Sequence, residues 1–404
     1  AGGKGRREAD EANKPAEVEA IEAFLLSQAE FRHNVITHHC EIRWTEEAGF
    51  LPLTDRDVNT LWGRMNKTVG RVYLTDIYNV IHSEFVPLFN PFQSYFDHLP
   101  SWDGVSDPIG DLADTVHVKS DQAEFRDYFR KWFVGILPAL LDDTVVNHEI
   151  LVLIGEQGLY KTTWFNFLLP PELRCYFYTK TNSDRLNKDD LFSLTEFALI
   201  CFEELDGMRP AELNQLKAMV TMPYVNERAA YGRNKERHPH IASFCGTGNN
   251  VQFLTDPTGN RRWLPFEVSQ IRDPHLHAIP YELVYSQAYA LWKSGFCHWF
   301  SQEEIRKLNM HNSRFEVPNL EEDLIRTHFR KPFEGEAGIF VTAADILEQI
   351  SSCLRYPLSP NKIGRIMAGL EFESIRYKGK RGYITVKKTG EDIDRERRSG
   401  ALGL

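Results

Sequence analysis

Short hydrophobic runs alternate with amphipathic helical segments through the middle of the chain. From residue 149 onward, apolar runs of four to six residues recur, and the segments between them repeat apolar positions at helical spacing. This alternation is typical of an α/β sheet whose strands are joined by crossover connections. The predicted strands are Ile150–Ile154, Cys175–Tyr178, Phe197–Phe202, Ile241–Gly246 and Trp263–Phe266, and the predicted closing helices are Tyr281–Lys293, Gln302–Asn312 and Leu320–Phe329.

The segments before this core favour helices. Glu17–Phe31 repeats apolar residues at helical spacing, and further helices are expected after a cap at Thr54 and around Ile77–Phe85. Asn34–Trp44 alternates enough to predict a hairpin strand. The N-terminal region is therefore predicted to be α-rich.

The last part of the chain has a third pattern. Helices are expected from Thr342 and from Ser359, the second with Pro360 at its first position, and a β-hairpin is expected over Ile375–Lys387. This order is typical of a winged helix-turn-helix. We therefore expect a linker (1–16), an α-rich N-terminal region (17–104), an α/β core (105–333), a winged-helix domain (334–390) and a flexible tail (391–404).

Composition and charge limit the number of domains, the partners and the compartment that are expected for the protein. The 404 residues suffice for two or three domains, and 47 basic against 57 acidic side chains give a net charge of −10, so any contact with nucleic acid must come from local basic patches. The six scattered cysteines form no C-x-x-C pair, and no segment has the length of a transmembrane helix or the pattern of a signal peptide. We expect a cytoplasmic protein without a membrane partner. Its polar first segment is typical of a linker behind a further domain.

A phosphate-binding loop is the main candidate for chemistry. In the G-x-x-x-x-G-K-[ST] pattern, backbone N–H groups surround the phosphates, the lysine contacts the β- and γ-phosphates, and the hydroxyl holds Mg²⁺. Here Tyr160 stands at the second glycine, which leaves open a βα turn that binds nothing. The predicted nucleotide-binding residues follow the strand directly and are Gly155, Glu156, Gln157, Gly158, Leu159, Tyr160, Lys161, Thr162 and Thr163.

Acidic residues follow a second apolar strand, as in a Walker B motif. One carboxylate would join Thr162 at Mg²⁺, and the next would polarise the attacking water. Glu203 and Glu204 are the expected pair, with Glu203 at the metal, although Asp206 is an alternative for either place. A solvated acidic turn is the other reading of the segment.

Polar residues after the third strand and before the fourth complete the expected site. Asn249 is the candidate sensor of the γ-phosphate, although Gly and Asn are also ordinary turn formers. Arg261 and Arg262 enter an apolar strand, where they form either a buried salt-bridge pair or a phosphate clamp. In the second case one of them would act as an arginine finger in the site of a neighbouring subunit.

Two basic segments are candidates for DNA contact. The first is an exposed hairpin in which an aromatic ring offers a stacking face, and the second is the wing of the C-terminal domain. A solvated loop and a protein-docking winged helix remain the alternatives. The candidates are Arg228, Tyr231, Arg233, Lys235 and Arg237 in the hairpin, and Arg376, Lys378, Lys380 and Arg381 in the wing.

These motifs, taken together, resemble the virulence-associated protein E family, which is related to the superfamily 3 helicases of small viruses and mobile elements. The resemblance covers roughly Pro87–Trp292 and rests on five segments. It implies an AAA+-like P-loop ATPase core, found in prophages and integrated elements, often behind a primase-like domain. The segments are Gly155–Thr162, Glu204–Asp206, Tyr231–Arg233, Gly246–Asn249 and Leu254–Arg262.

Two departures from the family pattern stand out. Tyr160 resembles the Tyr-Lys-Thr version of one bacterial subset, and Cys201 stands where many members carry glutamate. The second departure leaves Glu204 as the stronger catalytic candidate.

Three functional hypotheses follow. The first is an ATP- and Mg²⁺-dependent DNA helicase of a mobile element or prophage, which hydrolyses ATP as a homo-oligomeric ring, expected to be a hexamer, on single-stranded DNA. The second is an ATP-binding switch or DNA-docking adaptor without unwinding activity, for which the bulky Tyr160 is the best support. The third is a regulatory winged-helix DNA binder whose ATPase has decayed.

Overall fold

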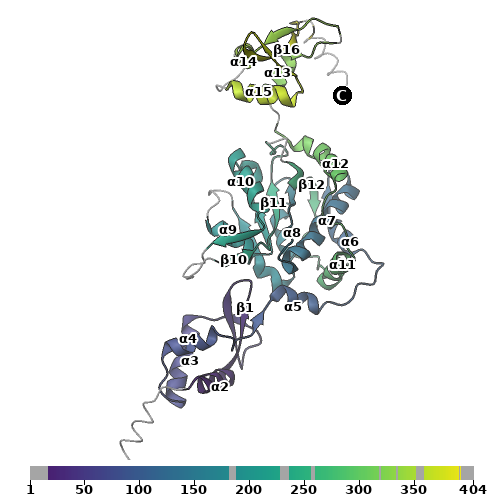
Figure 1. Ribbon diagram of the computed structural model, residues 1–404. Coiled ribbons are helices and arrows are strands. Elements are labelled where there is room, and N and C mark those ends of the chain that lie inside the picture. Colours follow the sequence, from purple (N-terminus) through teal and green to yellow (C-terminus); the bar gives the residue numbers. More distant parts are fainter. Residues whose placement is uncertain are drawn as a thin grey trace, which may run out of the picture. The chain divides into compact units, whose positions relative to one another are not determined.

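The chain falls into two units in the computed structural model, Ala1–Glu316 and Val317–Leu404 (Figure 1). The structure describes residues 17–181, 188–227, 236–255, 260–317, 320–333, 335–351, 359–390 and 392. The secondary structure is mixed α/β with several sheets. No helix among the described residues is long and apolar enough to cross a membrane.

The first unit begins with helices packed on a four-stranded sheet, so the predicted α-rich region also contains a sheet beyond the one predicted hairpin. The strand order is β3-β2-β1-β4, and β1 and β2 pair antiparallel from Ala29↔Trp44 to Asn34↔His39. The predicted helix therefore ends before residue 29. The elements are α2 (Val18–Gln28), β1 (Ala29–Asn34), β2 (His39–Trp44), β3 (Leu51–Pro52), α3 (Asp55–Thr68), α4 (Leu74–Ile81) and β4 (Leu88–Phe89).

A six-stranded sheet forms the centre of the first unit. Its order is β5-β12-β6-β11-β8-β7; β5 is antiparallel to β12, and the other neighbours pair in parallel. Four of the five predicted strands lie at or near their expected positions, whereas the second begins later because a 3₁₀ turn covers Pro171–Tyr176. The strands are β5 (Val116–Val118), β6 (Ile150–Ile154), β7 (Phe177–Lys180), β8 (Leu199–Phe202), β11 (Ser243–Gly248) and β12 (Trp263–Ile271).

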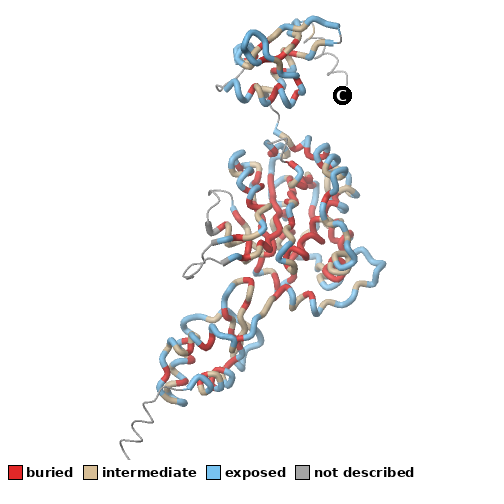
Figure 2. Tube along the Cα trace, viewed as in Figure 1, coloured by how far each residue is buried: buried red, intermediate tan, exposed pale blue. Residues whose placement is uncertain are grey.

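Helices cover both faces of this sheet (Figure 1). Because successive side chains of a strand point to opposite faces, Leu151 and Leu153 join one buried cluster while Ile150 and Val152 join the other. The strands are accordingly among the most deeply buried parts of the unit (Figure 2). The helices are α5 (Pro91–Asp97), α6 (Pro108–Ala113), α7 (Gln122–Leu141), α8 (Lys161–Phe167), α9 (Lys188–Glu196), α10 (Pro210–Val220), α11 (Tyr281–Lys293) and α12 (Gln302–Asn312).

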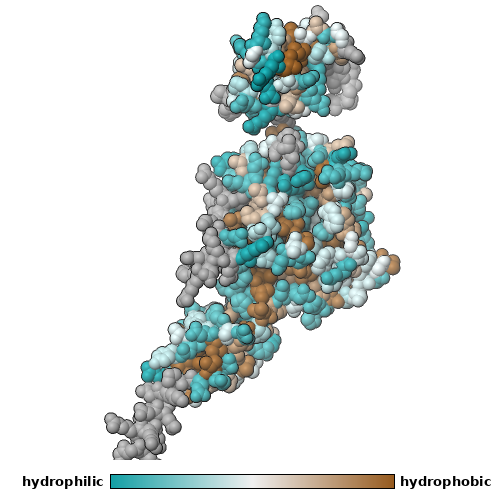
Figure 3. All heavy atoms as spheres, viewed as in Figure 1, coloured by the Kyte–Doolittle hydropathy of each residue, from teal (hydrophilic) through white to brown (hydrophobic). Residues whose placement is uncertain are grey.

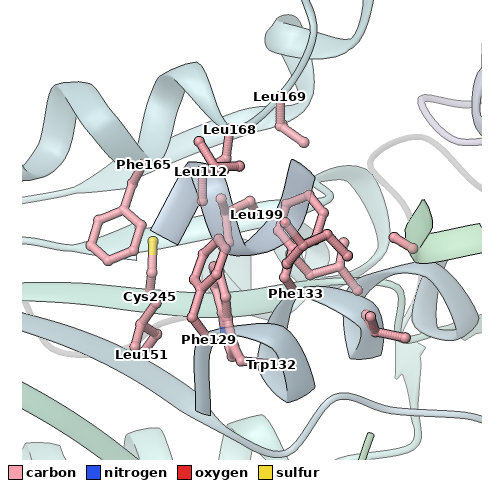
Figure 4. Close-up of a cluster of buried hydrophobic side chains, with 14 of the residues drawn as sticks. Leu112, Phe129, Trp132, Phe133, Leu151, Phe165, Leu168, Leu169, Leu199 and Cys245 are labelled. Atoms are coloured by element: carbon pink, nitrogen blue, oxygen red, sulfur yellow. The ribbon is translucent and has the colours of Figure 1, made fainter. Parts of the chain in front are cut away.

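The larger cluster fixes α7 and α8 against the sheet. Phe129, Trp132 and Phe133 of α7 and Phe165 of α8 are fully buried in this cluster, and the centroids of the Trp132 and Phe165 rings lie 6.1 Å apart (Figure 4). The Trp132 indole N–H donates to the carbonyl of Phe244 at 2.9 Å, which satisfies its polar atom inside the core. This packing holds the start of α8, and with it the end of the phosphate loop, in a fixed place.

A two-stranded antiparallel hairpin, β9 (Tyr224–Glu227) and β10 (Glu236–Pro239), precedes β11. Its arms lie where an exposed hairpin was predicted. The tip, with Arg228, Tyr231, Arg233 and Lys235, lies outside the described residues.

The second unit has its own small core, built around Ile346, Ile363 and Met367. Three helices pack against a sheet in which β16 pairs with β13, β14 and β15. The chain divides before α13, so this helix belongs to the second unit and not to the core. The elements are α13 (Leu320–His328), β13 (Phe329–Arg330), β14 (Ile339–Val341), α14 (Ala343–Ser351), α15 (Pro360–Gly369), β15 (Ser374–Tyr377) and β16 (Lys380–Lys387).

Candidate functional site

The loop between β6 and α8 keeps its curled backbone although Tyr160 replaces a glycine. Gly158 has φ 84°, and Tyr160 has φ 59° at the N-cap of α8. These left-handed conformations favour glycine, and Tyr160 adopts one at a steric cost of about 1–2 kcal/mol. The side chain of Tyr160 remains 41% exposed. The irregular residue therefore supplies the backbone shape that the pattern requires.

Lys161 turns into this loop. Its Nζ donates to the carbonyls of Gly155 at 2.6 Å and Glu156 at 2.7 Å, and lies 3.5 Å from Oδ1 of Asn249. Burial lowers the pKa of Lys161, and the carboxylate of Asp206 opposes that shift. The structure thus brings the predicted lysine and the predicted sensor together.

Thr162 and Glu203 also meet. The Thr162 hydroxyl donates to Oε1 of Glu203 at 2.8 Å, across the end of β8. Mg²⁺ typically takes one or two protein ligands together with waters and phosphate oxygens, so this pair suits a Mg²⁺ ion that arrives with a nucleotide. The described part of the chain holds no group of three or more His, Cys, Asp or Glu side chains that could hold a metal ion.

Glu204 is exposed and lies in the same cleft, in a strained conformation with φ 53°. Its position allows contact with solvent beside the Thr162–Glu203 pair. Positive φ values in non-glycine residues are concentrated at functional sites, where the surrounding structure maintains them.

Asp206 binds the segment that follows β11. Its Oδ1 accepts the backbone N–H of Asn249 at 3.1 Å, and its Oδ2 accepts the backbone N–H and side-chain amide of Asn250 at 3.1 and 2.7 Å. Of the three acidic residues, Glu203 is the one that accepts the hydrogen bond of the Thr162 hydroxyl. Sequence reasoning missed the partnership with Asn250, for which the signal was the closeness of two short turns after neighbouring strands.

The cleft itself measures about 340 Å³. It lies at the carboxyl edge of the sheet, where parallel strands β6, β8 and β11 all end. Ligands of open α/β sheets bind at this edge. The lining residues are Gln157, Gly158, Leu159, Tyr160, Lys161, Thr162, Thr163, Glu203, Glu204, Thr247, Gly248 and Asn249.

A larger cavity of about 580 Å³ lies elsewhere in the first unit and contains none of the predicted site residues. Several of its polar groups already bind one another, since Arg32 pairs with Glu41 at 2.5 Å and Asn34 donates to the Tyr176 hydroxyl at 2.8 Å. The smaller cleft is therefore the better candidate for catalysis.

Arg261 and Arg262 lie far from the cleft of their own chain. They precede β12, whose Trp263 pairs with Ile150 at the start of β6, so they stand at the amino edge of the sheet. The five residues of β6 separate the two edges by about 16 Å. Burial, followed by the neighbouring Arg261, lowers the pKa of Arg262.

Buried amides hold the turn that carries these arginines. Asn312 donates to the carbonyls of Asn260 at 2.8 Å and Trp263 at 3.0 Å, and Asn260 donates to Oε1 of Glu316 at 2.8 Å. The turn is therefore firmly attached to α12 and to the segment behind it.

The described DNA-binding candidates are exposed. The Arg237 guanidinium lies over the Tyr224 ring, 3.5 Å from its centroid, at the base of the hairpin. In the second unit, Lys378 and Gly379 both have positive φ values and form the two-residue turn of the β15–β16 hairpin. Arg376, Lys378, Lys380 and Arg381 are all exposed on this hairpin.

Comparison with known proteins identifies the family. The model of the virulence-associated protein E-like domain matches residues 97–317, more than half of the chain. The apo structure of the NrS-1 C terminal region (305-718) is similar at 11% identity, with a TM-score of 0.47 and coverage of 92% of this chain and 99% of that chain. The A form apo structure of the same region is similar at 12% identity, with a TM-score of 0.46 and coverage of 92% of this chain and 99% of that chain.

No curated protein matches the chain. The family match includes the phosphate loop, the acidic turn, the sensor segment and both arginines. The predicted resemblance is confirmed, and the chain belongs to the virulence-associated protein E family.

Proposed function

We propose that the protein is a Mg²⁺-dependent ATPase that acts on single-stranded DNA during replication of a mobile element or prophage. The observation that carries this proposal is the meeting of Lys161, the Thr162–Glu203 pair and Asn249 at one edge of a parallel sheet. These residues come from three segments of the chain, the start of α8, the end of β8 and the end of β11, and each has the chemistry that nucleotide hydrolysis needs at its position.

Each residue of the cleft would have its own role in the reaction. Backbone N–H groups of the loop and the Lys161 ammonium would bind the phosphates of ATP, while Asn249 would contact the γ-phosphate. Glu204 would orient the attacking water and accept its proton. Thr162 and Glu203 would hold Mg²⁺, which supplies charge neutralisation at the phosphates.

A second subunit would complete the site. Arg261 and Arg262 stand at the opposite edge of the sheet, so they can reach a nucleotide only in the cleft of a neighbour. An arginine that stabilises the transferring phosphoryl group accelerates hydrolysis by about 10³- to 10⁵-fold. This supports the proposal of a homo-oligomeric ring, expected to be a hexamer.

Contact with DNA would use the two basic hairpins. Arg237 on its aromatic platform and the exposed cations of the β15–β16 hairpin offer charge for phosphates on a protein whose net charge is −10. The order of strand, two helices and hairpin in the second unit supports a winged helix. A primase-like domain or partner would supply primers for the same replication.

Hydrolysis of ATP with and without single-stranded DNA tests the proposal. We expect DNA to stimulate hydrolysis by the wild-type protein and Lys161→Ala to lower the rate by about 100-fold or more, because the ammonium no longer stabilises the phosphates. Lys67→Ala removes an exposed lysine of α3 and serves as the matched control.

An unchanged rate in Lys161→Ala would refute this site. Normal ATP binding without DNA-stimulated turnover or strand separation would instead favour the ATP-binding switch. If nucleotide changed neither activity nor melting temperature, the regulatory DNA binder would be preferred, because a ligand at about 100 times its dissociation constant adds about 2.7 kcal/mol of stability.

A further inference from the structure

Asp206 connects the acidic turn after β8 to the sensor segment after β11. Its two carboxylate oxygens accept three hydrogen bonds, all from Asn249 and Asn250. The bond from Asn249 uses the backbone N–H, so it fixes the residue while the side-chain amide lines the cleft, with its Oδ1 3.5 Å from Nζ of Lys161. Asp206 itself is absent from the residues that line the described cleft.

Close packing of the two turns accompanies these bonds. A Cβ at Gly248 would lie 3.1 Å from Oδ1 of Asp206, and one at Gly246 would lie 2.2 Å from Cδ1 of Leu205. Leu205 is only 1% exposed. The two glycines therefore allow the turn that carries Asp206 to lie directly against the end of β11.

The same turn begins at Glu204. The N–H of Gly207 donates to the carbonyl of Glu204 at 2.8 Å, and Glu204 keeps its left-handed backbone. A movement of Asn249 toward a phosphate would be transmitted through one carboxylate to the segment that orients Glu204. These hydrogen bonds link Asn249, the proposed contact of the γ-phosphate, to Glu204, the proposed group that activates water.

We propose that Asp206 is a positioning residue that holds Asn249 in reach of the γ-phosphate and couples it to Glu204. This assignment rests on the proposed ATP site, but it concerns discrimination between ATP and ADP rather than hydrolysis. Asp206 is then neither a metal ligand nor a base, and its carboxylate acts through the backbone of Asn249 and through Asn250.

Binding measurements separate this role from a general structural one. The ratio of the dissociation constants of ADP and of a non-hydrolysable ATP analogue, both measured with Mg²⁺ by calorimetry, reports the contribution of the γ-phosphate. We expect Asp206→Ala to lower this ratio at least fivefold, with the affinity for ADP within about threefold of wild type, because only the third phosphate meets Asn249.

A double-mutant cycle gives the sharper result. Asn249→Ala should lower the ratio by a similar factor, and Asp206→Ala combined with Asn249→Ala should lower it no further, since both changes remove one interaction. An unchanged ratio in Asp206→Ala, or losses that multiply in the double variant, would overturn the proposal.

Two milder variants decide the question if Asp206→Ala does not fold. Asp206→Asn keeps one acceptor oxygen but sets an amide N–H₂ against the donors of Asn250, and Asn250→Ala removes only the 2.7 Å side-chain bond. Both variants should lower the ratio of the two dissociation constants, although by less than Asp206→Ala would. A wild-type ratio in both variants would refute the coupling. Nucleotide binding without hydrolysis by the wild-type protein would refute the proposed ATPase activity. The comparison of ADP and ATP-analogue binding would still test the role of Asp206.

Discussion

Two residues of the cleft have a strained backbone. Two of the five non-glycine residues with positive φ in the described part of the chain, Tyr160 and Glu204, line the same cleft. Such conformations persist where function or packing maintains them. The cost at Tyr160 is therefore evidence that the loop shape matters more than local backbone preference.

Two substitutions of Tyr160 distinguish the effect of its backbone conformation from the effect of its aromatic ring. Glycine accepts φ 59° without a steric penalty, whereas alanine keeps the Cβ and the penalty. We expect Tyr160→Gly to be more stable than Tyr160→Ala by about 0.5–1 kcal/mol in chemical denaturation, after the greater flexibility of unfolded glycine is included. Both variants should bind ATP within about threefold of wild type. A tenfold loss in both would show instead that the ring contacts nucleotide.

The site residues that sequence predicts best are those tied to strand ends. Lys161, Thr162, Glu203 and Asn249 follow predictable strands, and parallel strands bring their ends to one edge, so their meeting could be expected. The direction of Asp206 could not be predicted. Which way a carboxylate turns after a strand depends on the neighbouring turn, and that neighbour is 43 residues away along the chain.

Elements with continuous apolar runs were predicted more accurately than mixed ones. β6 lies at its predicted position because five consecutive buried residues favour a strand between two layers of helices. The first three residues of β1, Ala29–Phe31, were wrongly predicted as helix because they continue the polar and apolar mixture of α2. Pairing with β2, a tertiary interaction, determines its conformation.

The two glycines of β11 have a role at the level of elements, since they set the distance between two neighbouring strand ends. Gly246→Ala would force Leu205 to move from a buried position, so we expect a loss of about 1–3 kcal/mol in stability and a loss of ATP hydrolysis. Thermal unfolding and the hydrolysis rate measure both effects.

Gly63→Ala is the matched control. Gly63 lies within α3, and a Cβ there would meet nothing within 4 Å. Alanine should raise stability by up to about 1 kcal/mol because it favours the helix. If Gly246→Ala behaved in the same way, the two turns would not be closely packed.

At the scale of the whole molecule, the candidate nucleotide cleft and the paired arginines lie at opposite edges of one sheet. On the face drawn in Figure 3, hydrophilic residues predominate and hydrophobic residues gather in several patches. The proposed activity therefore depends on contact between copies, and it can be tested by mixing two inactive variants.

Lys161→Ala removes the ammonium that is proposed to bind phosphate and keeps both arginines. The variant with Arg261→Ala and Arg262→Ala removes both arginines and keeps Lys161. Each variant alone should be nearly inactive. In a randomly mixed 1:1 ring, about a quarter of the sites would join an intact cleft to an intact arginine pair, so we expect about a quarter of the wild-type rate.

A subunit with all three changes provides the control. Mixed with the double arginine variant, it adds no arginine and should restore no activity. Recovery in that control, or no recovery in the first mixture, would contradict an arginine supplied by a neighbour.

The separation of the two edges leaves two symmetries open to an active assembly. A two-fold axis that sets the strands of two copies antiparallel could place the arginines of each copy in the cleft of the other, which closes a dimer. A heterologous contact, repeated from copy to copy, also joins every donor edge to an acceptor edge. Such a contact closes into a ring when its rotation divides a full turn and otherwise grows as a helical filament. For an assembly built on this heterologous contact, the rotation between neighbours decides whether the proposed ATPase would encircle a strand of DNA or coat it.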